Sequence, residues 1–110
     1  MKGILDDPDT RAALRTAFVD SVRAGSEYGF WIGQSGNNYF AYPIYTSNLG
    51  PFIDPWANRP PTSDIFAHGH PFTYLAPGLS NHDVQIAARN HILIISIGWQ
   101  QLIDWADYRN

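Results

Sequence analysis

The sequence contains no cysteine. Disulfide bonds, thiolate catalysis and cysteine-bound zinc are therefore excluded, so any metal ion must be held by histidine and carboxylate side chains. Charged residues are also few, at 15% of 110 residues, and the formal net charge is −3. The seven Lys and Arg form no basic stripe. This pattern disfavours nucleic acid as a partner, and it disfavours attachment to a membrane surface.

Long apolar runs are absent as well. The longest aliphatic run, Ile92–Ile95, is far too short to span a bilayer. No apolar stretch follows Met1 that would indicate a signal peptide. We therefore expect a soluble protein; if it is exported, it would be carried as the tail of a longer chain. The length predicts a single domain over 1–110, and the 45% hydrophobic content is typical of a globular chain with a packed core.

Apolar periodicity and turn residues divide the chain into helices and strands. Asp7-Pro8 is a typical helix start, with Asp as the N-cap, and Ser80 is placed to cap a second helix. The order of elements predicts an α+β fold, a small mixed β-sheet flanked by helices. The expected elements are a helix at 8–24, a hairpin of strands 28–32 and 39–45, a loop at 46–62, a central strand at 64–70, a loop at 71–79, a helix from the Ser80 cap to about 90, a strand at 91–97 and a tail at 99–110 that is either a strand or a short helix.

Two histidines stand two positions apart in the segment His68-Gly69-His70-Pro71. Side chains at positions i and i+2 of a strand point to the same face, so we expect His68 and His70 to project together from the strand end. Such a pair suits two ligands of one zinc ion or of a neighbouring first-row metal. The alternative is a pair of polar, partly exposed histidines at the edge of a loop.

Two carboxylates could extend this pair. Asp83, in the first turn of the helix capped by Ser80, would complete a set of two imidazoles and one carboxylate with an open fourth position. Ser80 and Asp83 also resemble a capping box, which would explain them without a metal. Both roles can hold together, because a first-turn carboxylate at a strand-to-helix loop can face the histidine pair. Glu27, the single Glu of the chain, could act as the base in metal-assisted hydrolysis, or it could be a surface charge.

Three further polar residues have simpler interpretations. The Ser80 hydroxyl could stabilise an oxyanion, although capping alone would explain it. We expect His82 to lie at the surface or beside the ligands and His91 to open the strand at 91–97, and we assign neither to the metal.

Together, Glu27, His68-Gly69-His70-Pro71 and Ser80-Asn81-His82-Asp83 resemble the JAMM motif of the JAB/MPN metalloprotease superfamily. That motif is a Glu on an early strand, then His-x-His-Pro, then Ser-x-x-Asp. A further order of segments covers most of 8–98: an Ala-rich helix (Arg11–Ala24), a Glu-Tyr-Gly strand (Glu27–Gly29), a Tyr-rich strand ending in Pro (Tyr39–Pro43) and then the His motif. In this order the chain is similar to uncharacterised bacterial JAB-like domains at the ends of Rhs-type and other polymorphic toxins. Gly69 stands where Ser or Thr is usual in the motif, and the segment between His70 and Asp83 is longer than the usual spacing.

The resemblance implies a JAB/MPN-like fold, layered as in cytidine deaminases, and a Zn²⁺ ion held by His68, His70 and Asp83 with water as the fourth ligand. Glu27 would activate that water and Ser80 would stabilise the oxyanion. The implied activity is hydrolysis of peptide or isopeptide bonds in a protein or peptide substrate. The toxin branch adds an immunity protein as a second partner, and secretion as part of a larger toxin.

Two other functions compete with this one. The first is a non-enzymatic protein-binding module on a JAB-like fold, which would use an aromatic loop surface as its contact. The second is a metal-dependent nuclease, which the acidic balance disfavours. The metal content of the purified protein separates the hydrolase from the binding module. The aromatic residues in question are Phe52, Trp56, Phe72 and Tyr74.

Overall fold

The computed structural model describes residues 3–47, 53–71 and 78–109. The predicted α+β class, a small mixed sheet flanked by helices, is confirmed in this part of the chain. The elements in chain order are α1 (Pro8–Ala24), β1 (Gly29–Ser35), β2 (Asn38–Ala41), the 3₁₀ helix η1 (Pro55–Asn58), β3 (Ile65–Gly69), α2 (Asn81–Asn90), β4 (Leu93–Ile97), the 3₁₀ helix η2 (Trp99–Gln101) and β5 (Ile103–Asp107).

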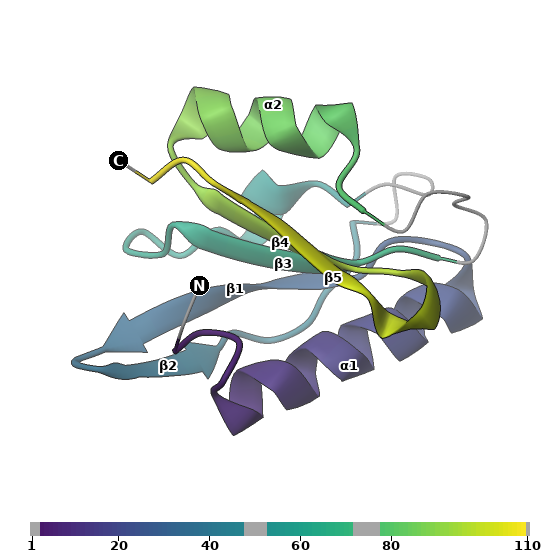
Figure 1. The fold of residues 1–110 in the computed structure, drawn as a ribbon, viewed down its shortest axis with the longest axis horizontal. Coiled ribbons are helices and arrows are strands. Elements are labelled where there is room, and N and C mark those ends of the chain that lie inside the picture. Colours follow the sequence, from purple (N-terminus) through teal and green to yellow (C-terminus); the bar gives the residue numbers. More distant parts are fainter. Residues whose placement is uncertain (1–2, 48–52, 72–77, 110) are drawn as a thin grey trace.

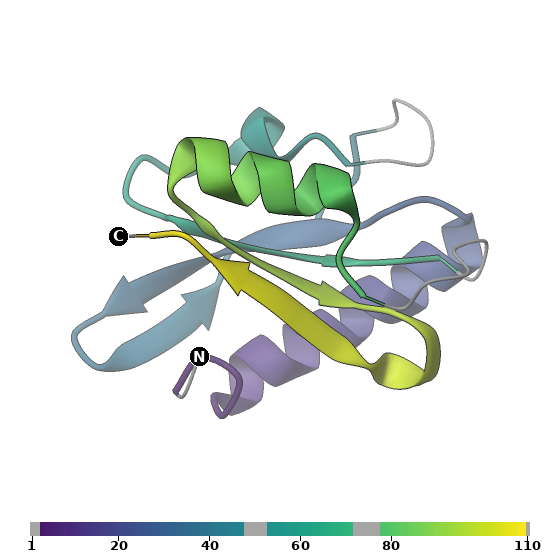
Figure 2. The ribbon, with the colours of Figure 1, turned by 45° about the horizontal axis from the view of Figure 1, so that its top comes forward.

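The five strands form one sheet in the order β2-β1-β3-β4-β5, so β3 is the central strand, as predicted (Figure 1). β3 and β4 run parallel, and every other neighbouring pair is antiparallel. The two helices lie on opposite faces of the sheet (Figure 2), with α2 connecting the two parallel strands. Among the described residues, no helix combines the length and the apolar character that crossing a membrane requires.

The first helix begins and ends at the predicted residues. The Asp7 side chain accepts a hydrogen bond from the Thr10 N–H at 2.8 Å, and Pro8 occupies the first turn. Gly25 ends the helix in the left-handed conformation, at φ 67°. Because apolar residues recur at helical spacing, one stripe of α1 packs on the sheet; its buried apolar residues are Leu14, Ala17 and Phe18.

Residues of β3 alternate between the two apolar clusters on either side of the sheet. Ala67 packs on the α1 side, whereas Phe66 packs on the α2 side with Trp31 and Ile94. The same alternation carries the next residue, His68, to the α2 side, where its ring stacks on Phe66. The polar residues expected to form a site therefore share a face with an aromatic cluster.

Several predicted boundaries are wrong. β1 continues to Ser35, because the hairpin turn needs only Gly36 and Asn37, with Gly36 at φ 61°. The loop at 46–62 contains η1. His91 does not open the strand predicted at 91–97. It ends α2 in the left-handed conformation at φ 54°, and that strand, β4, starts two residues later. β2 ends before the predicted Tyr45, which forms only an isolated bridge, and the tail forms both a 3₁₀ helix and a strand.

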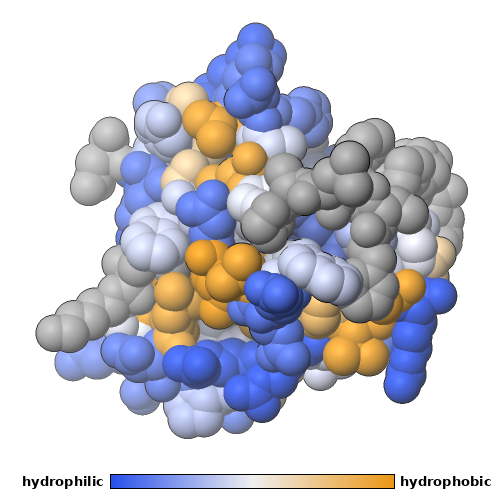
Figure 3. Space-filling model, turned by 45° about the vertical axis from the view of Figure 1, so that its right-hand side comes forward, coloured by the Kyte–Doolittle hydropathy of each residue, from blue (hydrophilic) through white to orange (hydrophobic). Residues whose placement is uncertain are grey.

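Exposed aromatic residues lie mainly near the C-terminus of the described chain. Trp99, Trp105 and Tyr108 are 52%, 46% and 42% exposed. On the side of the molecule shown in Figure 3, hydrophobic residues form patches separated by hydrophilic ones rather than one continuous face. That side therefore shows no broad apolar surface among the described residues.

Candidate metal centre

The two histidines of the sequence motif meet at the end of β3. His70 directly follows the strand, and its N–H donates to the Ile97 carbonyl at 2.9 Å. The Nε2 atoms of His68 and His70 lie 3.0 Å apart, and both residues are buried, at 1% and 2% exposure. The expectation that both imidazoles project to the same side is confirmed, and the alternative of two exposed histidines at a loop edge is wrong.

Gly69, between the histidines, faces α1 on the opposite side of the sheet. A Cβ at this position would lie 2.7 Å from Ser21 Oγ and 2.8 Å from the Ala17 carbonyl oxygen. The Ser21 hydroxyl donates to the Ala17 carbonyl at 2.7 Å, lies 3.1 Å from the Gly69 carbonyl and accepts the Tyr28 N–H at 2.9 Å. The close approach of α1 therefore requires glycine at the middle of the motif, and a buried serine ties α1, the start of β1 and the histidine segment together.

Asp83 both caps α2 and faces the histidines. Its N–H donates to Ser80 Oγ and its Oδ2 accepts the Ser80 N–H, both at 3.1 Å, which completes the capping box. The same Oδ2 atom lies 3.5 Å from Nε2 of His68 and 3.6 Å from Nε2 of His70. Asp83 therefore caps the helix and faces the histidine pair at the same time, as predicted from the sequence.

Glu27 is not a surface charge, because it is only 6% exposed. Its Oε1 accepts the N–H of Ile53 at 3.2 Å, and its Oε2 lies 3.8 Å from Nε2 of His70. Glu27, His68 and His70 form a buried group whose ligand atoms all lie within 4.8 Å of one another, and this group could hold a metal ion.

Asp83 and Glu27 compete as the third ligand, and the distances favour Asp83. Donor atoms bound about 2.0–2.1 Å from a tetrahedral zinc ion lie about 3.3 Å from one another. The triangle formed by the two histidine Nε2 atoms and Asp83 Oδ2 has sides of 3.0, 3.5 and 3.6 Å. Glu27 lies farther from His70, at 3.8 Å, and its other oxygen holds the Ile53 N–H. The group that Glu27 forms with the two histidines is therefore the wider of the two candidate donor sets.

The charges of these groups depend on one another. Burial alone would lower the pKa of His68, but the charge of Asp83, the hydrogen bond to it and the charge of Glu27 together raise that pKa above its ordinary value. Burial alone would raise the pKa of Asp83, but the two histidines hold it well below its usual range. No Lys or Arg lines this pocket among the residues that the structure describes. Two buried carboxylates therefore need a protonated histidine or a bound cation as their counter-charge.

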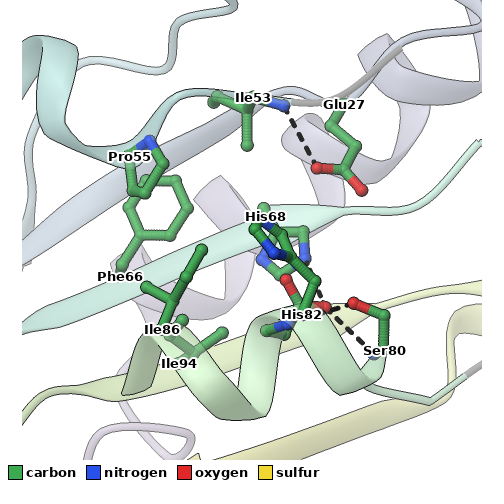
Figure 4. A pocket seen from close by; sticks show the side chains of 10 residues that line it. Glu27, Ile53, Pro55, Phe66, His68, Ser80, His82, Ile86 and Ile94 are labelled. Atoms are coloured by element: carbon green, nitrogen blue, oxygen red, sulfur yellow. Dashed lines mark hydrogen bonds and ion pairs between the residues drawn. The ribbon is translucent and has the colours of Figure 1, made fainter. Parts of the chain in front are cut away.

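The cluster lies at a small pocket that opens to solvent. Figure 4 shows His68 near its middle, with Glu27 and Ser80 on one side and apolar side chains on the other. His82, which the sequence left as either a surface residue or a neighbour of the ligands, is exposed and lines the pocket. The donor set of imidazoles and carboxylates fits zinc and its first-row neighbours.

The sequence did not indicate the groups that support this site. Ile53 holds Glu27 across 26 positions of sequence, and Ser21 reaches Gly69 across 48. One weak signal in the sequence is that Ser21 shares the helical spacing of Leu14 and Ala17, because a hydroxyl on the buried stripe of a helix needs partners. Of the predicted aromatic contact surface, Trp56 is 40% exposed, whereas Phe52, Phe72 and Tyr74 lie outside the described residues.

Comparison with known proteins adds nothing to this geometry: no protein-family model, curated protein or solved structure matches the chain. The function is therefore argued from the chemistry of the site.

Proposed function

We propose that this chain is a zinc-dependent hydrolase of peptide or isopeptide bonds of the JAB/MPN type, with His68, His70 and Asp83 as the zinc ligands. The observation that carries the proposal is the buried triangle of two imidazole nitrogens and one carboxylate oxygen, with sides of 3.0, 3.5 and 3.6 Å, in a pocket open to solvent. Three protein ligands leave one coordination position open, which distinguishes catalytic zinc sites from structural ones.

Two further side chains have the positions that hydrolysis needs. A zinc ion in this site would act as a Lewis acid and lower the pKa of a water molecule. Glu27 Oε1 is held by the Ile53 N–H, while Oε2 is directed to the His70 side, so the carboxylate is oriented to accept a proton and pass it to the leaving nitrogen. Ser80 Oγ acts in the helix cap as an acceptor. Its hydroxyl hydrogen can therefore donate to an oxyanion in the pocket.

The toxin assignment is part of the same proposal and depends on the order of the motifs. The Ala-rich helix segment, the Glu-Tyr-Gly segment at Glu27, the Tyr-rich segment ending at Pro43 and the His motif follow one another as in the JAB-like toxin domains that the sequence resembles. In that role the domain would be secreted within a larger toxin, would cleave a protein of the target cell and would be inhibited by an immunity protein.

A pair of single substitutions tests the roles of the two carboxylates. Wild-type protein purified without chelators and loaded with zinc should contain about one zinc per chain by elemental analysis. Glu27→Gln should keep that zinc but cleave a peptide library, followed by mass spectrometry, roughly 10²-fold more slowly. Asp83→Asn should lose the zinc, because a neutral amide is a poorer ligand than a carboxylate.

The opposite results would change the assignment. If Glu27→Gln released the metal and Asp83→Asn kept it, Glu27 would be the ligand. A wild-type protein that takes up no zinc would refute the hydrolase and favour the non-enzymatic binding module. Full activity in Glu27→Gln would require another group to accept the proton.

A further inference from the structure

A row of polar residues crosses the sheet at the level of His68. In the sheet of Figure 1, β3 pairs in parallel with β4, which places Ser96 opposite His68, and β4 pairs with β5, which places Asp104 opposite Ser96. The residues on both sides of Ser96 pack in the core on the α1 side, so alternation along β4 turns Ser96 to the α2 side, where His68 also lies. Neighbouring strands are about 4.8 Å apart, so side chains at opposed positions on one face are direct neighbours.

The Ser96 hydroxyl is buried without a partner. Ser96 is 0% exposed, and its hydroxyl makes no hydrogen bond with any residue that the structure describes. A hydroxyl buried in this way costs free energy until it acquires a partner. The carboxylate of Asp104, on the far side of the row, accepts the N–H of Leu79 at 3.1 Å and the N–H of Trp105 at 2.9 Å instead. The hydroxyl therefore lies next to His68 with its hydrogen-bonding capacity unused.

The His68 ring has a nitrogen with the matching need. Its Nε2 lies 3.0 Å from Nε2 of His70 and 3.5 Å from Asp83 Oδ2, so this is the atom that would bind a metal. Its Nδ1 is buried and makes no hydrogen bond among the described residues. A neutral imidazole that binds a metal through Nε2 carries its proton on Nδ1, and ligating histidines almost always donate that proton to a nearby oxygen. Two buried groups without partners, one a donor and one an acceptor, thus occupy opposed positions of β3 and β4.

We propose that Ser96 is a positioning residue of the metal centre, whose hydroxyl accepts the Nδ1 proton of His68 when zinc is bound at Nε2; this inference rests on the zinc site of the proposed function. The bond would fix the plane and the tautomer of the ring and make Nε2 a better electron donor to the metal. The competing acceptor is the Ile95 carbonyl. After burial and the nearby carboxylates, it also acts on the pKa of His68, but it makes no hydrogen bond with Nδ1 by distance and angle. A carbonyl within the sheet is fixed, whereas a hydroxyl can rotate to meet the proton.

Zinc affinity and the stability of the metal-free protein together test this role. Ser96→Ala should weaken zinc binding at least roughly 10-fold in competition with a chromogenic chelator, the usual scale for losing the partner of a ligating histidine. Without metal, the same variant should unfold at the same urea concentration as wild type or a higher one, because it removes a buried hydroxyl that has no partner among the described residues. Ser63→Ala is the matched control, since Ser63 is also buried and its hydroxyl donates to the Ile32 carbonyl at 2.6 Å. It should lower the urea midpoint and leave zinc affinity unchanged.

The ring proton of His68 gives a direct signal of the bond. By NMR of zinc-loaded protein with isotope-labelled histidine, wild type should show His68 protonated at Nδ1, and that proton should exchange with water faster in Ser96→Ala. Unchanged zinc affinity or unchanged exchange in Ser96→Ala would overturn the role of Ser96 and leave the zinc site intact, with the Ile95 carbonyl as the acceptor. Equal losses of stability and zinc affinity in Ser96→Ala and Ser63→Ala would show a packing effect and would also overturn it. A wild-type protein that takes up no zinc would refute the proposed function and this inference together.

Discussion

The two helices contact the end of β3 from opposite faces of the sheet, and they do so with different chemistry. α1 packs so closely that a Cβ on Gly69 would lie 2.7 Å from Ser21 Oγ. α2 instead directs Asp83 Oδ2 toward His68 and His70, at 3.5 and 3.6 Å. Because successive residues of a strand face opposite sides, one short segment is anchored on one face and carries the polar cluster on the other.

The starts of the same two helices show how little a cap motif says about function. Asp7 accepts the Thr10 N–H at 2.8 Å and caps α1. Asp83 is not the cap of α2 but lies three residues after the Ser80 cap, and it makes the reciprocal bond by accepting the Ser80 N–H at 3.1 Å. Its pKa is lowered because two buried histidines face it. Both aspartates make a hydrogen bond at the start of a helix, but Asp83 also belongs to a cluster formed by distant parts of the chain.

The largest expected effect is the loss of metal when both imidazoles at the end of β3, those of His68 and His70, are removed. The His68→Ala/His70→Ala variant should fall from about one zinc per chain to none by elemental analysis, since two of three protein ligands are gone. The matched control is His82→Ala/His91→Asn, which also removes two imidazoles, both of them exposed. Asn is chosen for position 91 because it tolerates the left-handed conformation found there. Zinc retained by the first variant, or lost equally from both, would remove the assignment.

A smaller effect should come from pH, and it should distinguish the metal-free from the zinc-bound protein. The raised pKa of His68 stabilises the metal-free fold below the unfolded value of 6.5, and this contribution is lost as pH rises through the folded value. The lowered pKa of Asp83 stabilises the fold above 3.8, and this contribution is lost as pH falls. Zinc must displace the His68 proton, so its affinity should rise by about tenfold per pH unit while that proton is bound.

Thermal unfolding with and without zinc between about pH 5.5 and 8.5 measures this dependence. The increase in melting temperature on adding zinc should grow with pH until the pH passes the raised pKa of His68, and it should then level off. An increase of the same size at every pH would show that zinc binds without displacing a proton from His68, and it would contradict the ligand set.

The smallest effect should come from removing the Ser21 hydroxyl, which ties α1 to the start of β1 and to the histidine segment. Ser21→Ala leaves the Tyr28 N–H without the hydroxyl that accepts it and should lower the free energy of unfolding by about 1–3 kcal/mol in urea titration. Thr16→Ala is the matched control, because the Thr16 hydroxyl donates to the Ala12 carbonyl at 3.0 Å on the exposed side of the same helix. It should change stability by less than about 0.5 kcal/mol. Equal losses in the two variants would show that contact with the histidine segment is not what anchors α1.

The local sequence was sufficient to predict where helices begin and end, because these signals lie within a few residues of the helix ends. The Asp7-Pro8 start and Gly25 predicted the bounds of α1, and the Ser80 cap predicted the start of α2. The ends of strands were less predictable, because a strand ends where its neighbouring strand stops forming backbone hydrogen bonds with it. Tyr45 carries a strand-like sequence, yet it makes only a single bridge to Gly29. His91 has no local feature that distinguishes a helix end from a strand start.

For the site, the sequence determined which groups could act together, and the tertiary structure decided how they do so. Alternation along a strand is a local property, so it was enough to place His68 and His70 side by side. The approach of Asp83, the burial of Glu27 against Ile53 and the glycine required by Ser21 all depend on contacts between segments far apart in the chain. Burial and pairing of this kind set pKa values and distances, and they follow from how helices and loops pack on the sheet rather than from residue spacing.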